Sequence, residues 1–296
     1  MLSVREINHN YSLKRNIVYL FTQRLETDGI ENARFEAIEL LVCAGADRTK
    51  LYTESISPGN LPAEVRQRAA ELLERRVNGE PLQYIIGEWE FYGLPFKVGK
   101  GVLIPRQDTE TLVETALDFL KSRLPEQRRV LDLCAGTGCI GITLAKLANA
   151  DVSCVELSGE AFGYLAENVR LNDVEERVKP IHGDIFDSEI RCGLGEFDII
   201  VSNPPYLTDS DMRSLQTEVT HEPKMALYGG SDGLDFYRSI VREYTASVKT
   251  GGAIFFEVGA GQAAEVARIL SESGFETSIV KDLCKIERVV WGIKSP

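Results

Sequence analysis

The chain has 296 residues, of which 44% are hydrophobic and 26% are charged, and its formal net charge is -12. This composition is that of a folded globular protein, and the length suffices for one large domain and one smaller domain. An acidic chain is poorly suited to bind DNA, and no apolar run reaches the roughly 20 residues that span a bilayer, so neither a membrane span nor a nucleic-acid partner is expected.

The first residues of the chain and its cysteines are those expected of a cytoplasmic protein. The first residues, MLSVREINHNYSLKRN, lack the apolar core of a signal peptide. The cysteines form no CxxC pair and have no histidine at ligand spacing, so we expect free thiols and no metal site. They are Cys43, Cys134, Cys139, Cys154, Cys192 and Cys284.

Residues 1–80 are predicted to form a small helical domain. Apolar residues recur at steps of three and four in NIVYLFTQRL, FEAIELLVCAGA and PAEVRQRAAELLERRVNG. Such a domain serves either for packing alone or for docking a substrate, and periodicity does not distinguish the two. Residues 81–105 contain β-branched and aromatic runs broken by glycines, which predict a β-hairpin linker.

Residues 106–296 alternate between helical and strand patterns, which predicts an α/β domain. Strands that are apolar throughout and separated by amphipathic helices form a mostly parallel sheet covered on both faces. The last two strands are joined without a helix and fit an antiparallel edge pair. Seven strand segments are expected: RRVLDLCAG, DVSCVEL, VKPIHGDIF, FDIIVSN, GAIFFEVG, ETSIV and RVVWGI.

The first turn from strand to helix, LDLCAGTGCIG, has the glycine spacing of a nucleotide-binding loop. Gly136, Gly138 and Gly141 match GxGxxG, and Glu156 ends the next strand, where a carboxylate can accept hydrogen bonds from two ribose hydroxyls. These residues alone favour a dinucleotide and S-adenosylmethionine about equally.

Acidic residues at the strand ends favour S-adenosylmethionine. Asp132 can lie under the positively charged amino-acid part of this donor, whereas beside a pyrophosphate it would be repulsive; its alternative role is to cap the following turn. Asp184 can accept from the adenine amino group with Ile185 beside the ring, unless the two serve only loop polarity and core packing.

The strongest chemical motif is Asn203-Pro204-Pro205-Tyr206 at the end of the strand FDIIVSN. Two prolines remove backbone donors and fix φ, so the Asn203 oxygen and the Pro204 carbonyl form a rigid pair of acceptors. Such a pair suits a planar NH2 group, and Tyr206 can stack on it. Alternatively, Asn-Pro begins a turn and Tyr206 is a core aromatic.

Together these motifs resemble the HemK/PrmC family of protein-glutamine N5-methyltransferases, which modify the Gly-Gly-Gln loop of peptide-chain release factors. The resemblance rests on segments along nearly the whole chain: GVLIPRQDTETLVE, VLDLCAGTGCIGITLA, GDIFD, FDIIVSNPPYL, EVTHEPKMALYGGSDGLDFYRSI and GGAIFFEVGAGQ. It implies a seven-stranded Rossmann-like class I methyltransferase domain behind a helical substrate-contacting domain, acting as a monomer.

The resemblance also implies residue roles. The donor, S-adenosylmethionine, and its product, S-adenosylhomocysteine, would be held by the loop of Cys134, Ala135, Gly136, Thr137 and Gly138, by Asp132, by Glu156 at the ribose, by Asp184 and Ile185 at the adenine, and by Asn203. The glutamine amide would be held by Asn203, Pro204, Pro205 and Tyr206, of which Asn203, Pro204 and Tyr206 are the catalytic residues.

The sequence departs from the family at two places, and two other functions stay open. IPRQDTE stands where the family commonly has IPRPETE, and Cys134 stands where it has a glycine. One alternative function is an adenine-N6 nucleic-acid methyltransferase, because NPPY suits any NH2 on a conjugated carbon, but such an enzyme must flip its base out of a duplex. The other is a nucleotide-sensing scaffold with a vestigial pocket.

Overall fold

A computed structural model describes residues 16–124 and 127–295 of the chain. The contacts divide it into two compact units, with the division between Gly87 and Glu88. Among the described residues, no helix is both long and apolar enough to cross a membrane.

The first unit consists of helices that bury one apolar face each. Phe21, Leu25, Leu41 and Leu73 are buried, as the three- and four-residue spacing predicts. Its α-helices are α2 (Ile17–Thr27), α3 (Ala33–Cys43), α4 (Arg48–Thr53), α5 (Ala63–Val77) and α6 (Leu82–Ile86).

The hairpin of β1 (Glu88–Phe91) and β2 (Leu94–Lys97) belongs to the second unit. Phe91 and Phe96 are 2% and 0% exposed, and they share an apolar cluster with the helices and strands of that unit. The segment 81–105, which the sequence predicted as a linker, is therefore divided: helix α6 falls in the first unit, while the hairpin packs into the second. Aromatic burial is the physical reason for the difference.

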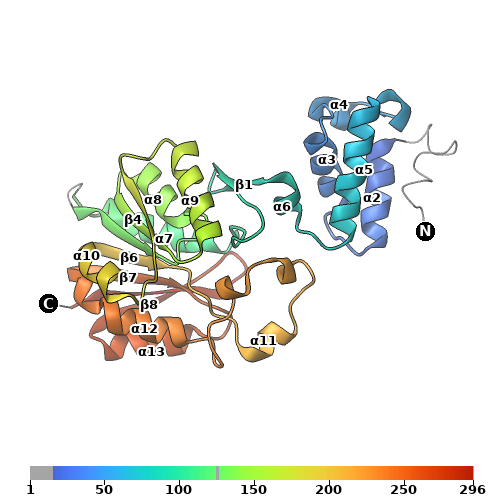
Figure 1. Cartoon of the computed structure of the whole chain (residues 1–296). Helices are drawn as coiled ribbons and strands as arrows, with labels where there is room; N and C mark the ends of the chain where they lie inside the picture. The colour runs from blue at the N-terminus through green and yellow to red at the C-terminus, as the bar shows by residue number, and fades with distance from the viewer. Residues whose placement is uncertain (1–15, 125–126, 296) are drawn as a thin grey trace. The chain divides into compact units, whose positions relative to one another are not determined.

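The second unit is built on a seven-stranded sheet in the order β5-β4-β3-β6-β7-β9-β8 (Figure 1). Strands β3 to β7 pair in parallel, and β9 lies antiparallel between β7 and β8. The predicted fold class is confirmed. The strands are β3 (Arg129–Leu133), β4 (Asp151–Glu156), β5 (Val178–His182), β6 (Phe197–Ser202), β7 (Val248–Glu257), β8 (Phe275–Lys281) and β9 (Glu287–Lys294).

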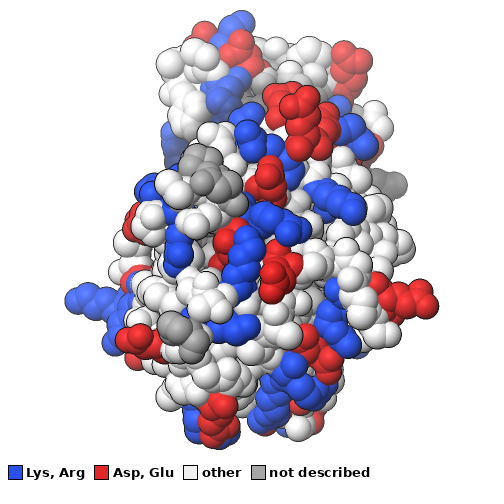
Figure 2. All heavy atoms as spheres, turned by 90° about the vertical axis from the view of Figure 1, so that its left-hand side faces the viewer, with Lys and Arg blue, Asp and Glu red and all other residues white. Residues whose placement is uncertain are grey.

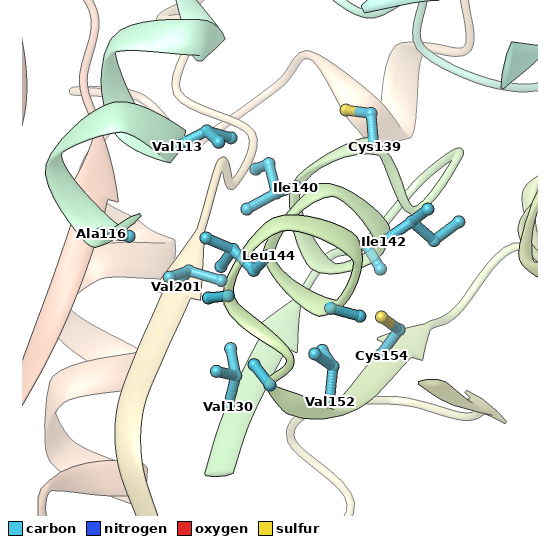
Figure 3. Packing of buried hydrophobic residues seen from close by; sticks show 14 of the residues in the cluster. Val113, Ala116, Val130, Cys139, Ile140, Ile142, Leu144, Val152, Cys154 and Val201 are labelled. Carbon is cyan, nitrogen blue, oxygen red and sulfur yellow. The ribbon is translucent and has the colours of Figure 1, made fainter. Parts of the chain in front are cut away.

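Helices cover both faces of this sheet, because successive strand residues point to opposite sides. Val130 lies in one apolar cluster with α7, α8 and α9, and its neighbour Leu131 lies in another with α10, α12 and α13. Figure 3 shows α8 surrounded by apolar side chains of α7, β3, β4 and β6. The helices are α7 (Thr109–Lys121), α8 (Cys139–Ala148), α9 (Gly159–Leu171), α10 (Ser188–Leu194), α11 (Asp209–Arg213), α12 (Asp235–Tyr244) and α13 (Ala263–Glu272).

The strand order reverses at β3, which has β4 on one side and β6 on the other. Connections from the carboxyl ends of β3 and β6 therefore leave in opposite directions and open a crevice between them. In open α/β sheets, ligands bind at this switch point.

The hairpin is tied to the sheet through the buried side chain of Asn168 on α9. Its Oδ1 accepts from the Lys97 N–H at 2.6 Å, and its Nδ2 donates to the carbonyls of Lys97 at 3.1 Å and Thr137 at 3.0 Å. Asn168 is 0% exposed, so water does not replace these bonds when they are lost.

We expect Asn168→Ala to lower the free energy of unfolding of the second unit by about 3 kcal/mol, because it leaves several buried backbone groups unpaired. Urea unfolding followed by tryptophan fluorescence measures this unit selectively, since both tryptophans, Trp89 and Trp291, lie in it. Glu167→Ala, at the exposed neighbouring position of α9, is the matched control. Equal midpoints for the two variants would contradict the assignment.

Candidate active site

A pocket lies at the carboxyl ends of β3, β4, β5 and β6 and brings together most of the residues that the sequence singled out. Each of these strands is followed by residues that line it, as the switch point requires. The predicted residues in its lining are Cys134, Ala135, Gly136, Thr137, Glu156, Asp184, Ile185, Asn203 and Pro205.

Glu156 is held rigidly at the end of β4. Its Oε2 accepts from the Gly136 N–H at 2.8 Å, and its Oε1 accepts from the Ser158 N–H at 2.7 Å. A carboxylate has about four acceptor sites, so both oxygens retain capacity for a further donor each. The side chain is 8% exposed and lines the pocket, which fits it to accept hydrogen bonds from a vicinal pair of hydroxyls.

The loop after β3 passes through left-handed conformations at Cys134, Gly136 and Gly138, with φ of 61°, 57° and 80°. Glycine adopts such angles freely, whereas a side chain there costs about 1 kcal/mol. The structure thus explains why a glycine suits the position of Cys134. Burial raises the pKa of the Cys134 thiol well above its usual range, so this side chain is a neutral wall of the pocket and not a nucleophile.

Asp132 does not line the pocket. It is 0% exposed, and its Oδ2 accepts from the Gly141 N–H at 2.9 Å in the first turn of α8. Its Oδ1 has no hydrogen-bond partner among residues 16–124 and 127–295. Burial raises the pKa of Asp132 to about 7. In the structure, Asp132 therefore caps the first turn of α8 and lies behind the loop that forms the pocket wall.

Two phenylalanines that sequence reasoning missed complete the wall near Asp184. The Asp184 Oδ1 accepts from the Phe186 N–H at 2.9 Å, and the rings of Phe186 and Phe236 lie 5.7 Å apart. Both rings line the pocket beside Ile185, which is 4% exposed. Phe186 directly follows Asp184 and Ile185 in the sequence, and this position could have identified it as a pocket residue. Phe236 comes from α12, and its only signal was its place in the segment EVTHEPKMALYGGSDGLDFYRSI.

Residues 101–106 form another wall of the pocket, and an ion pair between a partly exposed arginine and a buried glutamate fixes them. Arg106 pairs with Glu222, whose second oxygen accepts from the Ile104 N–H at 3.1 Å. Glu222 is 4% exposed; burial raises its pKa, and the Arg106 charge opposes that rise. The wall is therefore anchored to a segment more than a hundred residues later in the chain.

The Asn203–Tyr206 segment is clamped from several directions. The Asn203 Nδ2 donates to Thr109 Oγ1 at 3.4 Å, and the Tyr206 carbonyl accepts from Gln262 Nε2 at 3.0 Å. A Cβ at Gly229 would lie 2.5 Å from the Pro205 oxygen, so only glycine permits this approach. Main-chain hydrogen bonds join residue 207 to residues 227 and 229. The segment has little freedom to move.

A second pocket adjoins the first along this segment. It is lined by Tyr206 and Glu257, and it shares Leu103, Arg106, Asn203 and Ala226 with the first pocket. Asn203 thus lines both pockets. Pro204 and Gly138, two further predicted residues, line neither pocket. Pro204 is buried within the segment, and Gly138 is the N-cap residue of α8.

All six cysteines are free thiols. In the described part of the chain, no three His, Cys, Asp or Glu side chains are grouped as metal ligands would be.

Comparison with protein families identifies two matching models. A PrmC N-terminal domain matches residues 18–87, and a methyltransferase small domain matches residues 109–231. The second match includes the loop after β3 and the Asn203–Tyr206 segment.

Known proteins resemble the chain over most of its length. The release factor glutamine methyltransferase of Geobacter sulfurreducens is 44% identical over 272 residues, which cover 90% of this chain and 92% of that protein. That of Clostridium botulinum is 36% identical over 255 residues, covering 85% and 89%. A crystal structure of a methyltransferase from Pyrococcus furiosus has a TM-score of 0.51 at 19% identity, covers 70% of this chain and 91% of that chain, and shares the fold.

The role of Glu222 in holding the wall is testable. Glu222→Ala leaves the Ile104 N–H without an acceptor and frees Arg106, so we expect hydrogen exchange at the Ile104 amide to accelerate about 30-fold, which corresponds to about 2 kcal/mol of local stability. Glu222→Gln keeps an oxygen acceptor and should give an intermediate rate. NMR-detected exchange measures both, and an unchanged rate in Glu222→Ala would show that the ion pair does not anchor the wall.

Proposed function

The chain belongs to the release factor glutamine methyltransferase family, and from this premise we propose that it transfers a methyl group from S-adenosylmethionine to a glutamine side-chain nitrogen. The glutamine is that of the Gly-Gly-Gln loop of peptide-chain release factors, and the product is N5-methylglutamine. The observation that carries the proposal is the pair of adjoining pockets that share Asn203. We infer a monomeric, cytoplasmic enzyme.

The first pocket fits the methyl donor. Glu156 is oriented to accept from the ribose hydroxyls, and Asp184 with Ile185 and the two phenylalanines suits the adenine. The carboxylates in and behind the wall favour a cation and would repel a pyrophosphate, which favours S-adenosylmethionine over a dinucleotide. When bound, the donor supplies a methyl carbon activated by a sulfonium.

The acceptor nitrogen is a poor nucleophile, because its lone pair is delocalised into the amide. The chain compensates by placement. Asn203 Oδ1 would accept from one N–H group in the plane of the amide, which helps to fix the nitrogen in a near-attack geometry. We assign the second acceptor to the Pro204 carbonyl, whose residue lines neither pocket before a substrate binds. Tyr206, which lines the second pocket, would stack on the flat amide.

The same acceptors favour the transition state. Positive charge that develops on nitrogen strengthens its N–H donors, so fixed oxygens bind the transition state more strongly than the ground state. The clamping of Asn203–Tyr206 supports this role, since preorganised acceptors need no rearrangement during the reaction.

We assign docking of the release factor to the helical unit. Tyr19 and Tyr52 are 49% and 54% exposed there and line one pocket, which gives this small unit an exposed aromatic surface.

The function is tested by transfer of radiolabelled methyl from S-adenosylmethionine to purified release factor, with its natural Gly-Gly-Gln and with a Gln-to-Ala change. We expect label only on the natural protein. Equal labelling of both would exclude glutamine as the target.

The alternative target is adenine N6 in nucleic acid, which NPPY also suits. On the face drawn in Figure 2, Lys and Arg side chains are interspersed with Asp and Glu rather than gathered into one basic field. A basic surface is what a duplex requires. Methyl label in DNA or RNA that survives protease treatment would establish this alternative instead.

Two single substitutions should separate donor binding from catalysis. Asn203→Ala removes one acceptor of the transition state, so we expect turnover to fall roughly a hundredfold or more while the affinity for S-adenosylhomocysteine stays within about threefold. Glu156→Ala removes the ribose acceptor and the anchor of the loop, and should weaken that affinity at least tenfold, as for the loss of charged hydrogen bonds. Calorimetry and label transfer measure the two quantities. Unchanged turnover in Asn203→Ala would refute the catalytic assignment.

A further inference from the structure

Glu257, at the end of β7, is a buried carboxyl group beside the proposed acceptor site. Strand β7 pairs with β6 so that Phe256 lies opposite Ser202, and the residues that follow each of them are Glu257 and Asn203. Glu257 is 1% exposed and lines the second pocket together with Asn203 and Tyr206. A charge buried in such a place is costly unless it has a function or full pairing.

The side chains of Thr109 and Asn203 lie beside the Glu257 carboxyl group, and hydrogen bonding to each of them lowers its pKa. The Asn203 Nδ2 itself donates to Thr109 Oγ1 at 3.4 Å. The Glu257 Oε2 has no hydrogen-bond partner in the described part of the chain. Because the Asn203 NH2 donates to Thr109 Oγ1, the opposite end of the amide, Oδ1, is left to accept from a ligand.

We propose that Glu257 is a positioning residue for methyl transfer: as a carboxylate it holds the Asn203 NH2, and it thereby keeps Asn203 Oδ1 turned toward the substrate amide. The inference rests on the proposed role of Asn203. The positioning role explains why Asn203 presents its side-chain oxygen, and not its nitrogen, to the substrate. A substrate NH2 group requires an acceptor there, because two donors that face each other repel.

The protonation state of Glu257 decides this orientation. A protonated carboxyl group carries an O–H donor that can bond Asn203 Oδ1 and so stabilise the reversed amide. Burial raises the pKa of Glu257 to about 7, against the hydrogen bond from Thr109, the Arg288 charge and the hydrogen bond from Asn203, which lower it. The carboxylate is therefore formed as the pH rises through about 7, and activity should rise with it.

Other titratable groups also face Glu257, from each packed element. Asp108, before α7, raises its pKa, while Arg288 on β9 lowers it. Burial raises the pKa of the Tyr206 and Tyr237 phenols and of the Cys139 thiol, and the charge of Glu257 raises each of them further. These three groups therefore stay neutral near pH 7. The Tyr237 hydroxyl donates to the Glu257 main-chain oxygen at 2.9 Å and does not pair with the carboxylate.

The test is the pH dependence of kcat for the full-length protein, with release factor and S-adenosylmethionine saturating, between about pH 5.5 and 9. We expect the activity of the unmodified enzyme to rise with one ionisation near 7. In Glu257→Gln, kcat should fall at least tenfold and that ionisation should disappear, while the affinity for S-adenosylhomocysteine is unchanged. Glu276→Gln, at an exposed position of β8, is the matched control and should behave as the unmodified enzyme.

Thr109→Val supplies a second test that does not alter the carboxyl group. The change removes a hydrogen bond that lowers the pKa of Glu257, so the ionisation should move to higher pH. It also removes the Thr109 Oγ1 that accepts from Asn203, so the position of the ionisation, and not the size of kcat, is the readout. This variant decides the matter if Glu257→Gln does not fold. A profile that stays in place in Thr109→Val, or one that persists in a folded Glu257→Gln, would overturn the inference.

The outcome is separable from that of the proposed function. If Asn203→Ala loses turnover but Glu257→Gln retains both kcat and the pH profile, the catalytic role of Asn203 stands and the positioning role of Glu257 is refuted. If Asn203→Ala keeps full turnover, the catalytic assignment itself fails, and the positioning role fails with it.

Discussion

The register in which β3 pairs with β6 determines how the two halves of the site meet. Leu133 lies opposite Ser202, and the buried Ser202 hydroxyl donates to the Leu133 carbonyl at 2.6 Å. The next residues, Cys134 and Asn203, begin the loop along the first pocket and the Asn203–Tyr206 segment. A slip of one residue would turn Asn203 to the other face of the sheet and separate the two ligand spaces. The pairing of β3 with β6 thus places the two pockets next to each other.

Buried carboxyl groups surround this junction in a chain that is already acidic. Asp132 lies behind the donor loop, Glu156 beneath it, and Glu257 beside Asn203. Removing these groups from water raises the pKa of Asp132 and of Glu257 to about 7, so they ionise most readily when a cation is near. A sulfonium is such a cation, whereas a phosphate is not. The charges of the site therefore favour S-adenosylmethionine over a dinucleotide, a choice that the glycine pattern alone leaves open.

Sequence alone predicts those parts of the molecule that follow from local pattern and strand topology. The seven strands are recognisable by apolar runs, and the residues after four of them meet because parallel strands end at one edge. Helix α10 was missed, since seven residues are too short for helical periodicity. Asp132 was expected at the donor, but its side chain points to the Gly141 amide inside the fold. Phe236, Glu222 and Glu257 lie in segments that carry the family resemblance, but they reach the site through tertiary packing, and the pattern of those segments does not give their roles.

Segments other than Asn-Pro-Pro-Tyr on which the family resemblance rests also shape the second pocket. Asn-Pro-Pro-Tyr suits any planar NH2 group, so it does not by itself select a substrate. The space in front of it is bounded by Leu103 and Arg106, and Arg106 is held by Glu222 from a distant segment. Gly229, in that same segment, lies against the Pro205 main chain and permits no larger residue. Because these walls shape the second pocket, substrate choice would depend on them in the proposed reaction, while the chemistry would depend on Asn203.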